Sequence, residues 1–464
     1  MKKKKFIFLV LFIIIFTTSG CSLGGGGGTS DTLEPITLKY WRVWEGKDAF
    51  DEIIAKYNAI HPNVNIEYRK LRYSEYERAL LEAWAEDRGP DIFSIHNTWI
   101  KGYASKIVPL PLSTKMVYQF QQGTVKKELV TEIRATKSIG LKELKNDFID
   151  VVYNDVVIKT EDPETKQISE GIYGLPLSVD TLAMYYNKDL FNNAGIPNPP
   201  EVWDRNFQQA VKKLTKQDSK GNIIQSGVAM GGSTNVERFS DILSILMMQS
   251  GAQMMNGNAV TFHLTPPYLE SQGLNPGADA LRFYTDFANP AKEVYSWNSS
   301  MENSLDLFMQ GKLAMILGYA YHLPTIKAGA PKLNFEISKL PQINDSSNMN
   351  FANYWVEVVS KKTKNVDAAW DFIQFATKEE NVKSFLDKAN KPTALRNLID
   401  VQKEDLEIGV FADQLLTAKS WYQGKDSNAM ELIIADMIDS VIMGEEELED
   451  AVRLGVQRVQ QTIN

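Results

Sequence analysis

The sequence predicts an α/β protein with two lobes, each a mostly parallel sheet flanked by helices. Strand-like and helix-like segments alternate over residues 36–95 at the spacing of βαβ crossovers. Roughly 430 residues follow the N-terminal region, more than one hydrophobic core usually organises. We therefore expect two lobes, with ligands bound beyond the carboxyl ends of the strands.

Residues 1–20 have the pattern of a signal peptide. A basic segment, Lys2–Lys5, precedes the apolar run Phe6–Phe16. This run is too short for a permanent membrane span, which needs about 20 residues. Cys21 follows small residues in a pattern that resembles the bacterial lipobox, so we expect it to be lipidated, with an ordinary signal peptide as the alternative. Residues 21–35 would then be a lipidated cysteine and a glycine-rich tether, which holds the protein on the outer face of the cytoplasmic membrane, extracellular or periplasmic.

Charge and cysteine content exclude several classes of protein. The net charge is −8, and loss of the four lysines of the signal peptide leaves 46 basic against 58 acidic residues. This balance disfavours nucleic acid and an anionic membrane surface as partners. Cys21 is the only cysteine, so disulfides and thiolate metal sites are not expected. We expect a monomer with no metal and no cofactor.

The first strands and helices follow from hydrophobic spacing. Residues 36–44 read as a strand that enters a core. Asp48 can cap a helix over residues 50–60, whose apolar residues share one face. Residues 64–68 alternate as a second strand, and residues 91–95 form a short third strand.

Three further segments are predicted from their composition and spacing. Ser74 and Glu77 have the spacing of a capping box, which would begin the helix between the second and third strands. Residues 114–170 are polar and helix-like, and we expect a surface elaboration. Residues 400–464 are helical in pattern and end in an amphipathic helix over residues 445–459.

The residues at the carboxyl ends of the predicted strands are the first candidates for a binding site. Trp41, Trp44 and Glu45 follow the first strand, and Asn97 and Trp99 follow the third. Parallel strands bring these ends to one edge of a sheet, where ligands of α/β proteins bind.

Aromatic residues gather at predicted turns and strand ends and favour a surface that stacks on sugar rings. For any single residue core packing is as good an interpretation, but together they favour a ligand surface. The residues are Trp41, Trp44, Trp99, Tyr319, Tyr321, Tyr354, Trp355, Trp421 and Tyr422. Motifs of hydrolases, metalloproteases and nucleotide-binding proteins are absent from the sequence. A catalytic pair among the many carboxylates stays open.

One long stretch closely resembles the family 1 extracellular solute-binding proteins of bacterial ABC importers, which include maltose-binding protein and other sugar-binding lipoproteins. It runs over residues 174–191 and continues through 192–203. Four more segments are similar to the family's recurring segments in the same order: residues 57–66, 89–93, 308–316 and 369–375.

The resemblance implies two α/β lobes, crossing strands between them and a ligand cleft. It implies crossings near residues 175–180, 353–357 and 392. The implied N-lobe comprises 36–175 and 358–392, and the implied C-lobe comprises 176–357 and 393–464.

The resemblance also implies ligand-binding residues. Asp180 falls where sugar-binding members carry an acidic residue in the hinge strand. Asn97 and Trp99 fall in a loop with ligand contacts. Asn235 and Arg238 fall in a loop of the C-lobe. The family often has Trp where this chain has Tyr319 and Tyr321. The full set of expected ligand-binding residues is Trp41, Trp44, Glu45, Asn97, Trp99, Asp180, Asn235, Arg238, Tyr319, Tyr321, Trp355 and Trp421.

We thus expect a lipid-anchored receptor that binds a solute, above all an oligosaccharide, and delivers it to an ABC permease by hinge closure. The main alternative is the same fold with a non-sugar solute such as a polyamine or a phosphate ester. A secreted carbohydrate-active enzyme is a further alternative.

Overall fold

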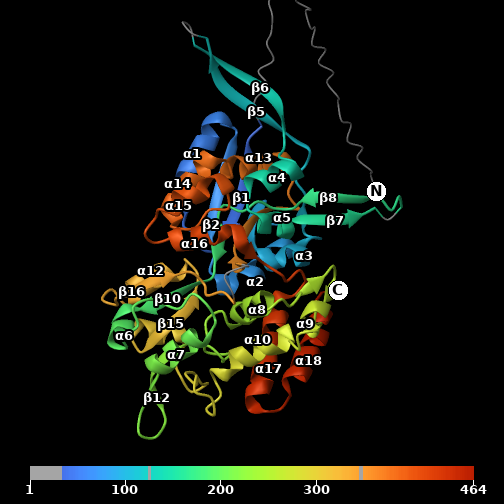
Figure 1. The fold of residues 1–464 in the computed structure, drawn as a ribbon. Helices are drawn as coiled ribbons and strands as arrows, with labels where there is room; N and C mark the ends of the chain where they lie inside the picture. The colour runs from blue at the N-terminus through green and yellow to red at the C-terminus, as the bar shows by residue number, and fades with distance from the viewer. Residues whose placement is uncertain (1–33, 124–126, 163, 344–347, 464) are drawn as a thin grey trace, which may run out of the picture. The chain divides into compact units, whose positions relative to one another are not determined.

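The computed structural model describes residues 34–123, 127–162, 164–343 and 348–463. The predicted signal peptide, Cys21 and the glycine-rich stretch up to residue 33 lie outside the described residues. Residues 35–464 form one unit, which contains two five-stranded sheets (Figure 1). In the part of the chain that is described, no helix has both the length and the apolar character needed to span a membrane.

The first sheet has the strand order β2-β1-β3-β18-β4. Its strands are β1 (Ile36–Arg42), β2 (Val64–Lys70), β3 (Ile92–His96), β4 (Ile107–Val108) and β18 (Trp355–Ser360). β1 pairs in parallel with β2 and β3, so the βαβ prediction is confirmed. β18 runs antiparallel between β3 and β4. Four of the five strands therefore run in the same direction, as predicted, and the late strand β18 makes the sheet mixed because it enters in the opposite direction.

Four helices pack around the first sheet: α1 (Asp51–Ile60), α2 (Tyr73–Ala85), α13 (Val366–Ala376) and α14 (Glu379–Ala389) (Figure 1). The predicted side-chain caps are wrong. α1 follows Phe50 without a side-chain cap, because Asp48 lies inside a preceding 3-10 turn, Lys47–Ala49. α2 begins before Ser74, so the predicted capping residue lies within the helix.

The second sheet has the order β11-β12-β15-β10-β16 and is also mixed. Its strands are β10 (Ala183–Asn187), β11 (Lys216–Gln217), β12 (Ile223–Val228), β15 (Leu313–Gly318) and β16 (Phe335–Ser338). β12 and β15 are parallel, whereas the other neighbours pair antiparallel. The longer helices of this half are α6 (Lys188–Asn193), α7 (Arg205–Leu214), α8 (Phe239–Gln249), α10 (Pro276–Asp286), α11 (Ser304–Met309), α12 (His322–Gly329), α17 (Ser427–Met443) and α18 (Leu448–Gln461). α18 confirms the predicted C-terminal amphipathic helix, and its apolar residues are buried.

Short elements complete the chain. They are α3 (Ile100–Tyr103), α9 (Pro267–Glu270), α15 (Ile399–Gln402), α16 (Gly409–Asp413), β13 (Met255–Asn256), β14 (Ala259–Val260), and the 3-10 turns Asn97–Trp99, Arg396–Leu398 and Leu415–Thr417.

Residues 114–170 are not mainly helical, which corrects the prediction. They form two β-hairpins, β5 (Ser113–Gln122) with β6 (Glu128–Lys137) and β7 (Val157–Glu161) with β8 (Ile168–Ile172), and two short helices, α4 (Leu141–Asp147) and α5 (Asp150–Val156). Met116, Tyr118 and Phe120 recur at every second position of β5, and this period of two is the strand signal that was missed.

Three stretches of chain run side by side where the two sheets connect. Leu175 bridges Glu357, Asp180 pairs with Asn353, and Ser178 bridges Thr393. They include β9 (Asp180–Thr181) and β17 (Asn350–Asn353), which share a small sheet with β19 (Ala418–Lys419). A Cβ on Gly174 would lie 2.3 Å from Cγ1 of Val356. The crossing is thus packed too closely for a side chain at residue 174.

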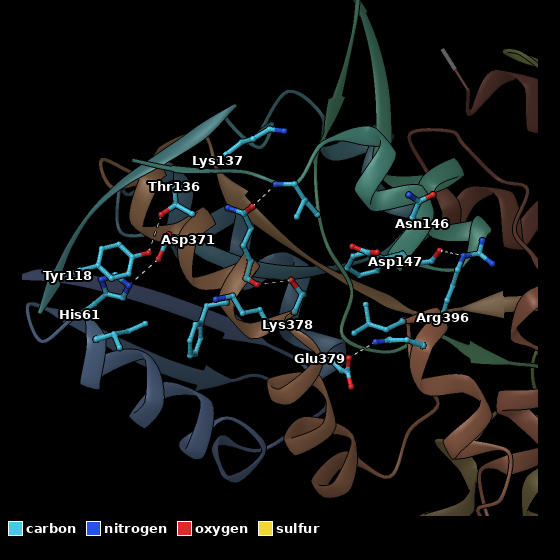
Figure 2. Close-up of a pocket in the computed structure, with 18 residues that line it drawn as sticks. His61, Tyr118, Thr136, Lys137, Asn146, Asp147, Asp371, Lys378, Glu379 and Arg396 are labelled. Carbon is cyan, nitrogen blue, oxygen red and sulfur yellow. Dashed lines mark hydrogen bonds and ion pairs between the residues drawn. The ribbon is translucent and has the colours of Figure 1, made fainter. Parts of the chain in front are cut away.

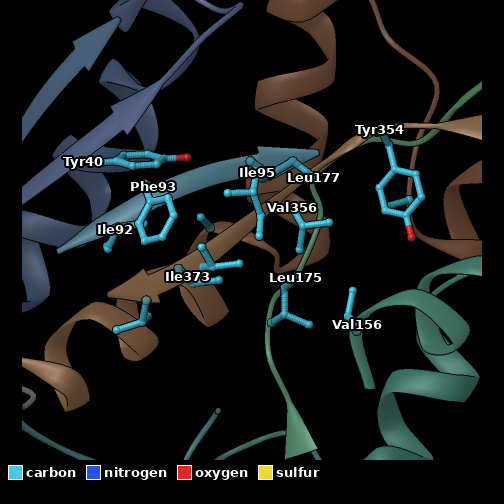
Figure 3. Packing of buried hydrophobic residues seen from close by; sticks show 14 of the residues in the cluster. Tyr40, Ile92, Phe93, Ile95, Val156, Leu175, Leu177, Tyr354, Val356 and Ile373 are labelled. Atoms are coloured by element: carbon cyan, nitrogen blue, oxygen red, sulfur yellow. The ribbon is translucent and has the colours of Figure 1, made fainter. Parts of the chain in front are cut away.

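Buried apolar residues form two clusters. The first includes Tyr40, Phe93, Leu175 and Val356 (Figure 3). The second lies around β10, β12 and β15. Leu395, Leu398 and Ile399 pack in the first cluster, whereas the predicted division assigned residues after 392 to the second lobe. The lobe boundaries 36–175 with 358–392 and 176–357 with 393–464 stay a prediction.

Candidate functional site

A cavity of about 540 Å³ lies where the ends of β1 and β15 meet the crossing strands. Its volume is typical of a site for a small molecule. It is lined by residues that follow β1, residues that follow β15 and residues of the crossing strands: Arg42, Trp44, Glu45, Ala320, Tyr321, His322, Ser178, Asp180, Asn353, Tyr354 and Trp355. The cavity is thus lined from both apolar clusters at the carboxyl ends of strands, where the sequence predicts a ligand.

A larger cavity, of about 710 Å³, lies beside hairpin β5–β6 and the ends of α1, α4 and α13 (Figure 2). His61, Tyr118 and Asp371 lie close together in it, and His61 Nδ1 is 2.7 Å from the carbonyl oxygen of Val117. None of the predicted ligand-binding residues lines this cavity, and its walls come from the first half of the fold alone. We therefore take the smaller cavity as the candidate site.

Aromatic rings from both halves of the fold meet in the candidate site. The rings of Trp44 and Tyr321 are nearly parallel, with an interplanar angle of 8° and centroids 6.5 Å apart. Trp44 also stacks on Tyr73 at 5.5 Å and meets Trp355 edge-on at 6.2 Å. Trp44 is 47% exposed and Tyr321 40%, so their rings are accessible to a ligand.

A buried network of charges forms the floor of the site. Nη2 of Arg42 lies 3.0 Å from Glu45 and 3.3 Å from Glu357, and Lys391 forms an ion pair with Glu45. Burial alone would raise the pKa of Glu45, but the charges of Arg42 and Lys391 hold it at about 2. The Tyr40 hydroxyl donates to Glu357 at 2.7 Å. The two cations and two carboxylates therefore balance within the protein.

Asp180 reaches the cavity from β9. Oδ1 of Asp180 accepts hydrogen bonds from the amides of Thr181 at 2.9 Å and Ala320 at 3.1 Å, and Oδ2 accepts from the amide of Tyr321 at 3.3 Å. Burial raises the pKa of Asp180 to about 7, against the opposing effect of these amides and of Lys391. Free lone pairs remain on the carboxyl group for a ligand hydroxyl.

His322 also lines the cavity, at the start of α12. Its Nδ1 accepts a hydrogen bond from the amide of Tyr319 at 2.9 Å. Burial lowers the pKa of His322 to about 4, so the ring is neutral at physiological pH. It adds polarity without charge.

The structure brings five of the twelve predicted ligand-binding residues into this cavity: Trp44, Glu45, Asp180, Tyr321 and Trp355. The other seven do not line it: Trp41, Asn97, Trp99, Asn235, Arg238, Tyr319 and Trp421.

Three of these seven lie in the first half of the fold and pack against the protein. Trp41 is 7% exposed and lies under the guanidinium group of Arg69. Asn97 donates to Asp155 at 3.0 Å, and Trp99 stacks on Tyr103 with centroids 5.8 Å apart.

The other four use their polar groups within the second half. Asn235 accepts from the indole of Trp297 at 2.8 Å and donates to two backbone carbonyls. Arg238 and Tyr319 both bond to Asp241, at 2.8 Å and 2.6 Å. Trp421 donates to Ser244 at 3.0 Å. The position of these residues in loops did not show whether their polar groups would bind a ligand or other residues of the protein.

Sequence reasoning missed several lining residues, among them Arg42, Lys391 and Asn353. Arg42 is two residues before Trp44 at the end of β1, and the alternation of side chains along a strand could have identified it. Lys391 and Asn353 lie beside the crossings that the family resemblance implied, so their position was an available signal. Within the described ranges, no group of three or more His, Cys, Asp or Glu side chains is arranged to hold a metal ion.

Comparisons with known proteins show the family and the fold of this chain. Residues 44–383 match the family model described as bacterial extracellular solute-binding protein. A sequence from Brucella abortus (strain 2308), described as a binding protein, is 22% identical over 413 residues, which cover 88% of this chain and 84% of the relative.

Two further similarities concern proteins named for sugars. The maltodextrin-binding protein MdxE of Bacillus subtilis (strain 168) is 27% identical over 264 residues, which cover 54% of this chain and 57% of MdxE. The structure of the cyclic alpha-maltosyl-1,6-maltose binding protein from Arthrobacter globiformis is similar with a TM-score of 0.69 and 19% identity, over 92% of this chain and 99% of that one. At this identity the structural similarity shows the two-lobed fold.

Proposed function

Because the chain belongs to the bacterial extracellular solute-binding protein family, we propose that it captures an oligosaccharide against the rings of Trp44 and Tyr321 and delivers it to an ABC permease. Members of this family bind solutes for ABC transporters and are not enzymes. Residues 1–20 would direct export, and a lipidated Cys21 with the tether would keep the receptor at the outer face of the membrane.

The nearly parallel pair Trp44 and Tyr321 is the observation that carries the sugar proposal. Sugar rings present flat patches of C–H groups, which stack on aromatic faces. Each ring belongs to a different half of the fold, so a sugar in contact with both favours a closed state of the cleft over an open one. Asp180 and Glu45 would then bind hydroxyl groups at the edge of the ring.

The charges of the lining disfavour a phosphate ester, one of the two rival solutes. Four carboxyl groups, of Glu45, Asp48, Asp180 and Glu237, stand beside three cationic groups, of Arg42, Lys388 and Lys391. Glu45 is already paired with Arg42 and Lys391. Three carboxyl groups, of Asp48, Asp180 and Glu237, then remain beside one ammonium group, of Lys388, so the lining lacks the free cations that a phosphate ester would need. The accessible rings of Trp44 and Tyr321, rather than the charges, favour a sugar over a polyamine.

A thermal-shift screen tests the proposal. The panel contains linear malto-, manno- and galacto-oligosaccharides, spermidine and glycerol phosphate. A ligand present at 100 times its dissociation constant adds about 2.7 kcal/mol to the free energy of unfolding. We expect stabilisation by at least one saccharide series and by neither charged compound. Stabilisation by spermidine or glycerol phosphate alone contradicts the proposal.

Variants of the two rings test the site itself. Trp44→Ala and Tyr321→Ala should each weaken binding of the best saccharide about tenfold, which is 1.4 kcal/mol. Tyr268→Ala is the matched control, because this tyrosine is 61% exposed and lies outside the cavity. The loss should persist at high salt, since stacking involves no net charge. Unchanged affinity in both ring variants would remove the aromatic pair from the site.

A further inference from the structure

Strand β6 has a free edge. Residues 128–137 pair with β5 on one side only, and nine of their ten side chains are exposed. The start of β5 is fixed to the body of the protein, because the Lys115 amide donates to Asp367 at 3.1 Å and the Val117 carbonyl oxygen lies 2.7 Å from Nδ1 of His61. The hairpin then extends past the ends of α1 and α13 (Figure 1). The edge of β6 is thus the outer edge of this hairpin.

The odd-numbered residues of β6 present their backbone groups at this edge. Lys115 and Val117 direct their backbone groups towards the body, and they lie opposite Ala135 and Ile133 in the ladder. Residues opposite each other in an antiparallel pair direct these groups both inwards or both outwards. The groups that point away from β5 therefore belong to residues 129, 131, 133, 135 and 137, and no hydrogen bond to them occurs in the described part of the chain. Such an unpaired edge can pair with another strand.

The charges of β6 are self-complementary. Glu132 and Arg134 lie on one face, on either side of Ile133. Two copies of β6 that run antiparallel, with Ile133 opposite Ile133, place Glu132 of each copy opposite Arg134 of the other. Residues 132 and 134 direct their backbone groups towards β5, so they form a non-hydrogen-bonded pair, the kind in which opposite side chains lie closest. Two opposite-charge pairs across strands stabilise such a sheet.

The other face of β6 carries exposed apolar side chains. Ile133 is 73% exposed and Leu129 is 64% exposed, and Ile133 lies beside Val117 of β5. In the same register the two copies of Ile133 meet at the centre, so a row of four β-branched side chains crosses the shared sheet. A two-stranded hairpin is only marginally stable by itself, whereas a sheet of four strands with an apolar row is more stable.

We infer that β6 pairs with β6 of a second copy of this chain, so that two hairpins form one four-stranded antiparallel sheet across a two-fold axis. A two-fold interface requires a self-complementary surface, and the register with Ile133 at its centre provides one. The interface is small, so the dimer forms at micromolar concentrations and the expected monomer is the state at lower ones. The inference goes beyond the proposed function, because the residues of this edge lie outside the candidate site.

Sedimentation equilibrium tests the dimer. The chain is used from residue 22 onwards, so that acylation of Cys21 cannot cause association, and it retains the whole compact unit of residues 35–464. The wild type should self-associate with a dissociation constant between about 1 and 500 µM. Glu132→Arg and Arg134→Glu should each weaken self-association at least about tenfold, because like charges then face each other twice. An equimolar mixture of the two variants should associate as tightly as the wild type, since each supplies the charge that the other needs.

Two further variants separate strand pairing from a general effect of charge. Glu161→Arg is the matched control, because it makes the same change of charge on the exposed strand β7 and should leave association unchanged. Ile133→Pro removes an outward N–H group and leaves the ladder with β5 intact, so it should also weaken association while the circular dichroism spectrum stays that of the wild type.

Three results would overturn the inference. They are a wild type that stays monomeric at about 500 µM, a mixture of the two charge variants that associates no better than either alone, and a control that weakens association as much as Glu132→Arg. Each of them leaves the proposed function standing, since saccharide affinity of all these variants should equal that of the wild type.

Discussion

Asp180→Asn should remove a loss of stability that the wild type undergoes as the pH rises, because Asp180 is buried. The carboxyl group is 6% exposed, and its pKa is raised from 3.8 to about 7 mainly by burial. A pKa that is higher in the folded state means that folding favours the protonated form. The group's contribution is therefore complete below the unfolded pKa and is lost as the pH rises through 7.

The size of the effect follows from the shift. Three pKa units at 1.36 kcal/mol each amount to roughly 4 kcal/mol of unfolding free energy, lost by the wild type between about pH 4 and pH 8. The asparagine side chain of the variant cannot ionise, so the variant has no such loss. Its amide oxygen can still accept from Thr181 and Ala320, whereas its amide nitrogen faces the backbone N–H of Tyr321 at a cost that does not depend on pH.

Denaturant unfolding from pH 4 to pH 8 measures this difference. The free energy of unfolding of the variant minus that of the wild type should rise by roughly 4 kcal/mol over this range. Asp400→Asn serves as the control, because Asp400 is 94% exposed and should give parallel curves. A constant difference between Asp180→Asn and the wild type, to within about 1 kcal/mol, would refute the argument from burial.

Asp180→Asn should also weaken the proposed saccharide binding about tenfold at pH 8, because a charged acceptor is lost.

Three other changes have expected outcomes. Gly174→Ala should lower stability by about 1–3 kcal/mol in thermal unfolding, because its Cβ would lie 2.3 Å from Val356, and an unchanged melting temperature would contradict the tight crossing. The pKa of His322 is lowered in the folded state, so its contribution to the free energy of unfolding is complete above about pH 6.5 and is lost as the pH falls towards 4. His322→Asn should therefore lose less stability than the wild type between pH 6.5 and pH 4. The same loss of stability in both proteins would contradict this prediction. Cys21→Ser should release the protein into the medium or leave an uncleaved precursor, as fractionation and N-terminal sequencing would show; a membrane-bound, normally processed variant would exclude lipidation of Cys21.

Regular periodicity made the first part of the fold predictable. The strands over residues 36–95 follow from apolar alternation and from the helix faces between them. β18 joins the same sheet from far along the chain, and local sequence holds no signal for a partner that distant. The hairpin β5–β6 was missed for another reason, since the recurrence of apolar residues at every second position of β5 was outweighed by the overall polarity of the hairpin.

The site was predictable at strand ends and less so in loops. Trp44 and Glu45 follow a strand whose direction was evident, so their place at the cavity was expected. Asn235 and Arg238 lie in a loop, where the same polar groups can serve a ligand or the protein. Asn235 bonds to Trp297 and Arg238 to Asp241, and such pairings between distant residues become visible only in three dimensions.

The position of β18 also affects how the chain folds while it is being made. β18 lies between β3 and β4, so the sheet begun by residue 36 stays incomplete until residues 355–360 have been synthesised. Until then the edge of β3 is unpaired, and loop closure opposes the pairing of strands so far apart in sequence. The first half therefore cannot reach its final stability ahead of the second. If the predicted signal peptide directs export, such a delay would keep the polypeptide unfolded for passage through a membrane, at the cost of a period in which its exposed strand edge can aggregate.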